Sequence, residues 1–147
     1  MNATGAFLCT RAALAGMLER DSGRVVTVAS TAGVVGAKYT AAYSASKHAA
    51  VGLTRAVAAE VAGTGVTANA VCPTFVRTDM TRESLDRIAE TTGRSQAESE
   101  AALTAASPLG RLLEPDEVAF AVAFLAAPEA GAINGQTLIL DGGGIQA

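Results

Sequence analysis

The chain has 147 residues, of which 50% are hydrophobic and 15 are glycine, and its formal net charge is −3. This length suits one domain with a sizeable core, and the composition suits tightly packed α/β layers. Because basic residues are not in excess, we expect no nucleic-acid partner. No apolar run reaches the roughly 18 residues of a membrane span, and no signal peptide is visible. We therefore expect a cytoplasmic protein without membrane contact.

The two cysteines predict neither a disulfide framework nor a metal site. Cys9 and Cys72 lie far apart in the sequence, each among apolar residues, so we expect both to be small buried core residues. No group of His, Cys, Asp and Glu has the spacing of a metal-ligand set. We expect no metal cofactor.

The first half of the chain alternates helical and strand patterns. Apolar residues at helical spacing predict a helix over about residues 6–19, and the run Val25–Ala29 predicts a buried strand. A loop over residues 32–40 then leads into an alanine-rich helix over about residues 41–62. Glycines at positions 63 and 65 end that helix, and residues 66–71 predict the second strand.

The second half contains a polar stretch before the last helix and strand. In this stretch, residues 78–106, we expect two short helices over about residues 82–91 and 96–105, separated by Gly93. A proline and acidic residues at 114–117 predict the start of a helix that ends near residue 126. Residues 136–140 predict the third strand, closed by a glycine turn. Strands that alternate with helices predict an α/β fold with a doubly wound parallel sheet.

Residues 63–68 match the letters of a dinucleotide-binding glycine motif, but in the wrong context. That motif binds a pyrophosphate where a strand turns into a helix, because N–H groups at the helix N-terminus face the anion. Here the glycines follow a helix and precede a strand. We therefore expect no phosphate site at this turn.

Tyr43 and Lys47 stand four residues apart near the start of the 41–62 helix, so their side chains share one helix face. A free tyrosine has a pKa of about 10, and acid-base work near neutral pH needs about 4 kcal/mol of preference for the phenolate. One ammonium about 4 Å away, at an effective dielectric of about 20, supplies on the order of that amount. The pair is chemically sufficient for acid-base catalysis, although this spacing also occurs by chance on surface helices.

Ser30 follows the first predicted strand, thirteen residues before Tyr43, at the sheet edge where parallel α/β folds bind ligands. With this serine, the YxxxK pattern of Tyr43 and Lys47 resembles the catalytic motif of the short-chain dehydrogenase/reductase family. The resemblance covers the whole chain, since residues 69–80 resemble that family's nicotinamide loop and residues 134–143 its closing strand. It implies that residues 1–147 are the C-terminal catalytic part of a Rossmann-like domain, with residues 78–107 as a substrate lid. The alternative for residues 78–107 is a plain helical hairpin on the surface.

The resemblance also implies a role for each matching catalytic residue. Tyr43 would donate a proton to a substrate carbonyl, and Lys47 would lower the tyrosine pKa and bind the cofactor ribose. Ser30 would hydrogen-bond the substrate oxygen, where charge develops in the transition state. Asn2 falls where the family has an asparagine of its proton relay, and the alternative for Asn2 is a frayed helix end.

The implied cofactor is NAD or NADP. Pro73, Val76 and Thr78 fall in the loop over the nicotinamide, where the Val76 backbone and the Thr78 hydroxyl would hold the carboxamide. For Thr78 the alternative is a helix N-cap ahead of Asp79. Thr74 replaces the glycine of the family's N-x-x-x-P-G-x-x-x-T pattern, which puts the local backbone path in doubt because glycine tolerates dihedrals that threonine resists.

The family's first half, which holds the adenosine pyrophosphate, has no counterpart in these residues. We expect a fragment of a longer reductase, a start set too late, or a truncated relic. The first hypothesis is the catalytic part of an oxidoreductase that interconverts a ketone and a secondary alcohol, inactive as the isolated chain. Within the family the sequence looks most like 3-oxoacyl or polyketide ketoreductases and hydroxyacid dehydrogenases.

The alternative hypothesis is a non-catalytic homologue that acts through subunit association. The helices near residues 6–19 and 41–62 correspond to the family's dimer interface, and small residues at Ala49, Ala50 and Gly52 would permit close packing there. Under both hypotheses we expect a homo-oligomer, a dimer or a tetramer.

Overall fold

The protein is described by a computed structural model that covers residues 2–105 and 107–146. Its regular elements, in chain order, are α1 (Asn2–Glu19), β1 (Gly23–Val28), the 3-10 turn η1 (Thr31–Gly33), α2 (Ala41–Glu60), β2 (Val66–Pro73), α3 (Asp79–Thr92), α4 (Gln96–Thr104), α5 (Pro115–Ala126), the 3-10 turn η2 (Pro128–Ala132) and β3 (Thr137–Leu140).

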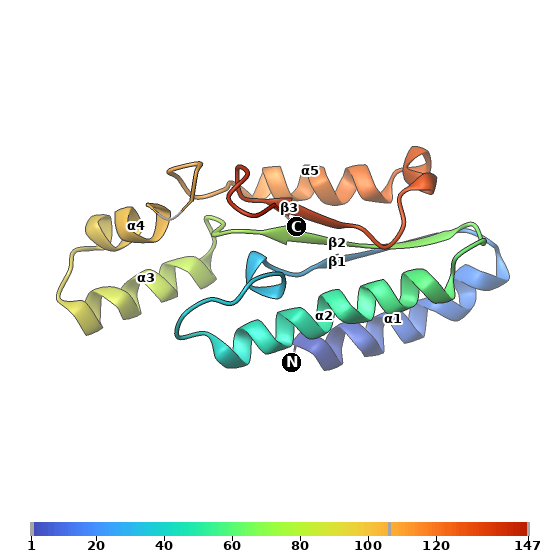
Figure 1. The fold of residues 1–147 in the computed structure, drawn as a ribbon, viewed down its shortest axis with the longest axis horizontal. Helices are drawn as coiled ribbons and strands as arrows, with labels where there is room; N and C mark the ends of the chain where they lie inside the picture. Colours follow the sequence, from blue (N-terminus) through green and yellow to red (C-terminus); the bar gives the residue numbers. More distant parts are fainter. Residues whose placement is uncertain (1, 106, 147) are drawn as a thin grey trace.

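The three strands form one parallel sheet in the order β1-β2-β3. Figure 1 shows α1 and α2 covering one face of this sheet and α5 covering the other. The central strand β2 is buried along its whole length, as expected of a strand with neighbours on both sides and helices on both faces. The predicted α/β fold with a doubly wound parallel sheet is confirmed.

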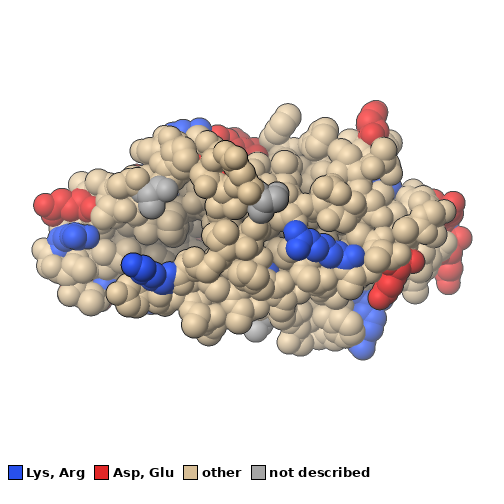
Figure 2. All heavy atoms as spheres, in the orientation of Figure 1, with Lys and Arg blue, Asp and Glu red and all other residues tan. Residues whose placement is uncertain are grey.

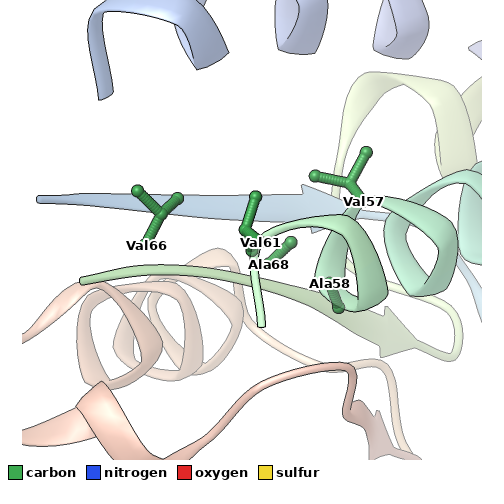
Figure 3. Packing of buried hydrophobic residues seen from close by; sticks show 5 residues of the cluster. All are labelled: Val57, Ala58, Val61, Val66 and Ala68. Carbon is green, nitrogen blue, oxygen red and sulfur yellow. The ribbon is translucent and has the colours of Figure 1, made fainter. Parts of the chain in front are cut away.

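The core has two layers because alternate residues of each strand point to opposite faces. On the α1 and α2 side, Figure 3 shows Val57 and Ala58 of α2, together with Val61 just after the helix, packing against Val66 and Ala68 at the start of β2. On the α5 side, Val71 of β2 packs against Ala121 and Leu125. Small side chains let the helices approach the sheet closely, which is why this alanine-rich sequence packs well.

The predicted elements agree with the structure except at their ends and in two short turns. α1 begins at Asn2, earlier than the predicted residue 6. The turns η1 and η2 were not predicted, because they are too short to show periodicity. The boundary between α3 and α4 is at Gly93, as predicted, because Gly93 ends α3 in the left-handed conformation with φ of 71°.

The prediction of two buried cysteines is wrong for Cys9. Cys72 is fully buried in β2, but Cys9 is exposed, because no residue of α1 is fully buried. Ala50 also differs from its predicted place in an interface, since it is 3% exposed and packs inside the molecule. Ala49 and Gly52 are exposed on α2, as the interface hypothesis requires.

The structure requires glycine at positions 63 and 65, once for the backbone dihedral and once for space. Gly63 has φ of 84° after the end of α2, and the turn leads into β2. A Cβ at Gly65 would lie 1.9 Å from the carbonyl oxygen of Asp21, and the Gly65 N–H donates to the Asp21 carboxylate at 2.6 Å. This close approach joins the turn after α1 to the turn after α2.

The polar stretch forms a helical hairpin at one end of the molecule. Figure 1 shows α3 and α4 at the end toward which the strands point, away from the sheet. Ser95 and Glu98 form a reciprocal capping box that starts α4. Within the described residues, no helix combines the length and the apolar character that a membrane crossing needs.

Candidate active site

Ser30 lies two residues after the end of β1, at the sheet edge predicted for the site. Its hydroxyl oxygen accepts a hydrogen bond from the Ala32 N–H at 3.1 Å and so caps η1. The extended backbone of Ser30 and this cap fix the side chain where the strand turns away from the sheet. The hydroxyl proton stays available for a ligand, because this contact uses the oxygen only as an acceptor.

Tyr43 and Lys47 lie together on the first turns of α2. The Lys47 Nζ is 5.7 Å from the centre of the Tyr43 ring. It also donates a hydrogen bond to the carbonyl oxygen of Val28, the last residue of β1, at 3.1 Å. This hydrogen bond holds the Lys47 ammonium at the end of β1. The Tyr43 side chain is partly open to solvent, with 37% of the residue exposed.

The position of Lys47 between α2 and the sheet changes its electrostatics. Burial lowers the pKa of the Lys47 ammonium, and the nearby Cys72 opposes this by raising it. Burial likewise raises the pKa of the Cys72 thiol, against smaller lowering effects from the Ser30 backbone and from Lys47. The lysine therefore belongs to the same small volume as the ends of β1 and β2.

Gly33 sets how closely the Ser30 turn approaches α2, a role that was not predicted from the sequence. A Cβ at Gly33 would lie 2.8 Å from the Lys47 carbonyl oxygen, a contact that real Cβ atoms do not make. Gly33 is buried and has an ordinary φ, so the space, and not the dihedral, requires glycine here. The only signal in the sequence was a glycine close behind the serine.

Asn2 lies at the start of α1 and reaches α2. Its Nδ2 donates to the Ser46 hydroxyl at 3.1 Å, and that hydroxyl donates to the Tyr43 carbonyl oxygen at 2.7 Å. Asn2 is thus brought to the helix that carries Tyr43 and Lys47. Among the described residues no hydrogen bond joins Asn2, Ser30 or Lys47 to the tyrosine hydroxyl.

The residues predicted to hold the nicotinamide lie on the segment after β2. Pro73 ends β2 and pairs with Leu140 of β3. Val76 forms an isolated bridge with Leu113. The two hydrogen bonds of this bridge run from the Arg77 N–H to the Leu113 carbonyl and from the Leu113 N–H to the Phe75 carbonyl, so the Val76 N–H has no partner among the described residues. Thr78 caps α3, since its hydroxyl accepts from the Thr81 N–H at 3.4 Å, as the alternative for this residue predicted.

Thr74 fits its position without backbone strain. In the described residues the only non-glycine residues with left-handed φ are Asp21 and Tyr39, so Thr74 has an ordinary φ. Its N–H donates to the Leu140 carbonyl oxygen at 3.0 Å, which continues the pairing of β2 with β3. The doubt raised by the missing glycine is removed, because this backbone path needs no glycine dihedral.

Comparison with known proteins identifies the family. Residues 1–144 match the family model described as enoyl-(acyl carrier protein) reductase, which belongs to the short-chain dehydrogenases/reductases. The chain belongs to the short-chain dehydrogenase/reductase family. The family resemblance predicted from Ser30, Tyr43 and Lys47 is confirmed.

Individual members of the family match nearly all of the chain. A 3-oxoacyl-(acyl-carrier-protein) reductase of Vibrio cholerae is 42% identical over 142 residues, covering 97% of this chain and 54% of its own. A Xanthobacter autotrophicus protein named inactive 2-(S)-hydroxypropyl-CoM dehydrogenase 2 is 44% identical over 144 residues, covering 97% and 60%. The crystal structure of an actinorhodin polyketide ketoreductase variant with NADPH superimposes with a TM-score of 0.91 at 44% identity, covering 97% and 56%.

The chain thus spans little more than half the length of the relatives it matches.

Proposed function

We propose that this chain is the catalytic part of an oxidoreductase that interconverts a ketone and a secondary alcohol with NAD or NADP. The observation that carries the proposal is the placement of Tyr43 beside Lys47, whose ammonium is tied to the end of β1 next to Ser30. In this proposal residues 1–147 form a single domain and residues 78–107 cover the substrate. The protein works in the cytoplasm as a homo-oligomer.

The residues in this region fit a nicotinamide cofactor. The Lys47 ammonium has three N–H donors, of which one is used on Val28, so the others can bind ribose hydroxyls. The free N–H of Val76 suits the carboxamide oxygen, with Thr78 beside it. The bound cofactor would supply the hydride, which no side chain of the protein can provide.

The side chains supply the proton and hold the substrate. Tyr43 donates its hydroxyl proton to the substrate oxygen during reduction and takes it back during oxidation. The positive charge of Lys47 stabilises the phenolate that remains on Tyr43. Ser30 donates a hydrogen bond to the same substrate oxygen, where negative charge develops. Asn2, whose Nδ2 donates to the Ser46 hydroxyl on α2, would take part in the proton relay.

The acid-base role is tested by Tyr43→Phe in a chimaera whose upstream half comes from the Vibrio cholerae reductase. We expect turnover of a ketone substrate to fall by about 10²–10⁴-fold, the usual size of an acid-base contribution. Cofactor affinity should stay within a few-fold, because only the hydroxyl is lost. Lys47→Ala should lower both turnover and cofactor affinity, since the ammonium stabilises the Tyr43 phenolate and binds the cofactor ribose.

Tyr39→Phe is the matched control, because Tyr39 is a fully exposed tyrosine four residues earlier. It should leave turnover unchanged. If the Tyr43→Phe chimaera keeps more than about a tenth of the activity, Tyr43 is not the acid-base residue.

A second candidate function is association without catalysis. α1 has no fully buried residue and exposes Phe7, Leu8 and Leu18, between 42% and 47% each. The relative named as inactive matches this chain as well as the named reductases do. In this case the chain would bind a second copy or a longer family member through α1 and α2.

A further inference from the structure

Three strand ends converge on one small pocket beside Ser30. Thr31 follows β1 by three residues, Thr74 directly follows β2, and Asp141 directly follows β3. Together with Ser107 and Pro108, these residues line a pocket of about 120 Å³. Ligands of open parallel sheets bind at the carboxyl ends of the strands, and this pocket occupies that edge.

The pocket wall is polar, and its groups suit an uncharged ligand. The carboxylate of Asp141 is 6% exposed and accepts from the N–H groups of Gly143, at 2.9 Å, and Ile145, at 2.8 Å. These bonds hold the carboxylate in place, and its negative charge disfavours an anion in the pocket. The volume corresponds to roughly four water molecules at about 30 Å³ each, enough for a few non-hydrogen atoms.

The two threonines provide hydrogen bonds that the protein itself does not use. Neither the Thr31 nor the Thr74 hydroxyl has a hydrogen-bond partner among the described residues. The Ser107 hydroxyl, by contrast, donates to the Asp141 backbone oxygen at 3.4 Å. A hydroxyl group can donate or accept, so Thr31 and Thr74 can bind either an alcohol or a carbonyl oxygen.

Thr74 distinguishes this pocket from one built on the family pattern, because it stands where that pattern has glycine. A glycine would remove both the hydroxyl and the methyl group from the wall. Since Thr74 adopts an ordinary φ, its side chain is present without a cost to the backbone. The substitution therefore changes the pocket and leaves the path of the chain intact.

We propose that this pocket is a substrate subsite for a second, uncharged oxygen function, and that Thr74 selects substrates that carry one. The preferred class is a ketone with a neutral hydroxyl group a few atoms from the reacting carbonyl. The proposal rests on the proposed function, but binding in the pocket needs neither cofactor nor turnover. The two can therefore fail separately.

The binding test uses the 147-residue chain with labelled threonine methyl groups, observed by NMR. It is titrated with butane-1,3-diol and with butan-2-ol, which differ by one hydroxyl. We expect the diol to shift the Thr31 and Thr74 signals and to bind about threefold to tenfold more tightly, the range that one neutral hydrogen bond provides. Thr74→Val, which keeps the shape and removes the hydroxyl, should abolish this preference.

Thr92→Val is the matched control, because Thr92 is an exposed threonine at the end of α3 whose hydroxyl bonds to the Ile88 carbonyl oxygen. It should keep the preference for the diol. An unshifted pair of threonine signals, or equal binding of both alcohols to the unmodified chain, would overturn the subsite. A preference that survives Thr74→Val would overturn the role of Thr74.

Kinetics in the chimaera provide the second measurement, which does not depend on the isolated chain. The substrates are 4-hydroxybutan-2-one and butan-2-one, the ketones of the same two alcohols. We expect kcat/KM to favour the hydroxyketone and Thr74→Val to lower this ratio by about threefold to tenfold while butan-2-one is still reduced. An unchanged ratio contradicts the subsite. A chimaera that reduces neither ketone contradicts the proposed function, and the NMR titration then decides the subsite alone.

Discussion

Gly33 shows how a single residue without a reactive group can set the geometry of the candidate site. It allows the turn that carries Ser30 to lie against the backbone of Lys47, and Lys47 in turn contacts the end of β1. A side chain at this position would push apart the two segments that carry the serine and the lysine. Glycine is required here for steric reasons, so a larger residue should lower the free energy of unfolding.

We expect Gly33→Ala to destabilise the chain by about 1–3 kcal/mol, the usual cost of adding a methyl group to a packed site. The reason is the 2.8 Å approach of the new Cβ to the Lys47 carbonyl oxygen, a backbone atom that cannot rotate away. The measurement is urea unfolding. Gly36→Ala is the control, since a Cβ there meets nothing within 4 Å. Equal stability of the two variants would contradict the steric argument.

At the scale of elements, the start of α5 depends on a cluster of charged side chains. Glu117 accepts two hydrogen bonds from the Arg111 guanidinium, at 2.7 Å and 2.8 Å, and one from the Glu114 N–H at 2.8 Å. Glu114 and Glu117 form a capping box around Pro115, the first residue of the helix. Helix α5 covers one face of the sheet, so its start belongs to the packing of that face.

These contacts predict a pH-dependent contribution to stability. The hydrogen bonds from Arg111, and then that from the Glu114 N–H, lower the pKa of Glu117 from 4.5 to about 2. Because the folded state holds the proton less tightly than the unfolded state, the contribution is complete above pH 4.5 and is lost as the pH falls toward 2. Glu117→Gln should therefore lower Tm near pH 7, by about 2–4 °C.

The measurement is thermal unfolding of the parent chain and the glutamine variant across this range. The gap in Tm should narrow as the pH falls from 4.5 toward 2. Asp116→Asn is the control, because Asp116 is the neighbouring acid in the same helical turn. A gap for Glu117→Gln that is the same at pH 7 and at pH 2.5 would show that the ionised carboxylate is not the cause.

At the scale of the whole molecule, charged side chains cover little of one face, and large apolar side chains are exposed on two helices. On the face drawn in Figure 2, uncharged atoms cover most of the middle, and acidic side chains lie toward the ends and the rim. Exposed aromatic side chains occur on α1, at Phe7, and on α5, at Phe120 and Phe124. One edge of β1 has no neighbouring strand in the described residues, which leaves backbone groups open for pairing.

We predict that the chain associates through α1 and α2 and is at least a dimer. The reason is the exposed apolar surface of α1 and the small exposed residues Ala49 and Gly52 on α2, which let two helices approach closely. The measurement is light scattering at tens of micromolar protein. Leu8→Glu, on the exposed part of α1, should shift the population toward monomer. A folded monomer in the unmodified chain would contradict the prediction.

We predict that the isolated chain binds NADH and NADPH with a dissociation constant above about 50 µM. A dinucleotide is held largely by its pyrophosphate at a glycine turn between a strand and a helix. The glycine turn at 63–65 has the reverse order, so contacts remain only for the nicotinamide end. Each lost 1.4 kcal/mol weakens binding about tenfold. Fluorescence titration of the purified chain measures this, and tighter binding of either cofactor would disprove the prediction.

The sequence by itself determined the order and type of the main elements and the family. Helix and strand periodicity, proline and glycine are local signals, which is why α2, α4 and α5 were predicted nearly to the residue. The candidate site was also predicted from the sequence, because the serine follows a strand and the tyrosine and lysine lie four residues apart on one helix face.

The tertiary structure decided which surfaces are covered and which side chains meet. Cys9 lies in an apolar sequence yet is exposed, because burial depends on what packs against α1 and not on the residues beside it in the chain. The pocket of Thr31, Thr74 and Asp141 was invisible in the sequence, since its members come from three separate strand ends. Only the parallel order β1-β2-β3 brings those ends to one edge, and that order arises from contacts between residues far apart in the chain.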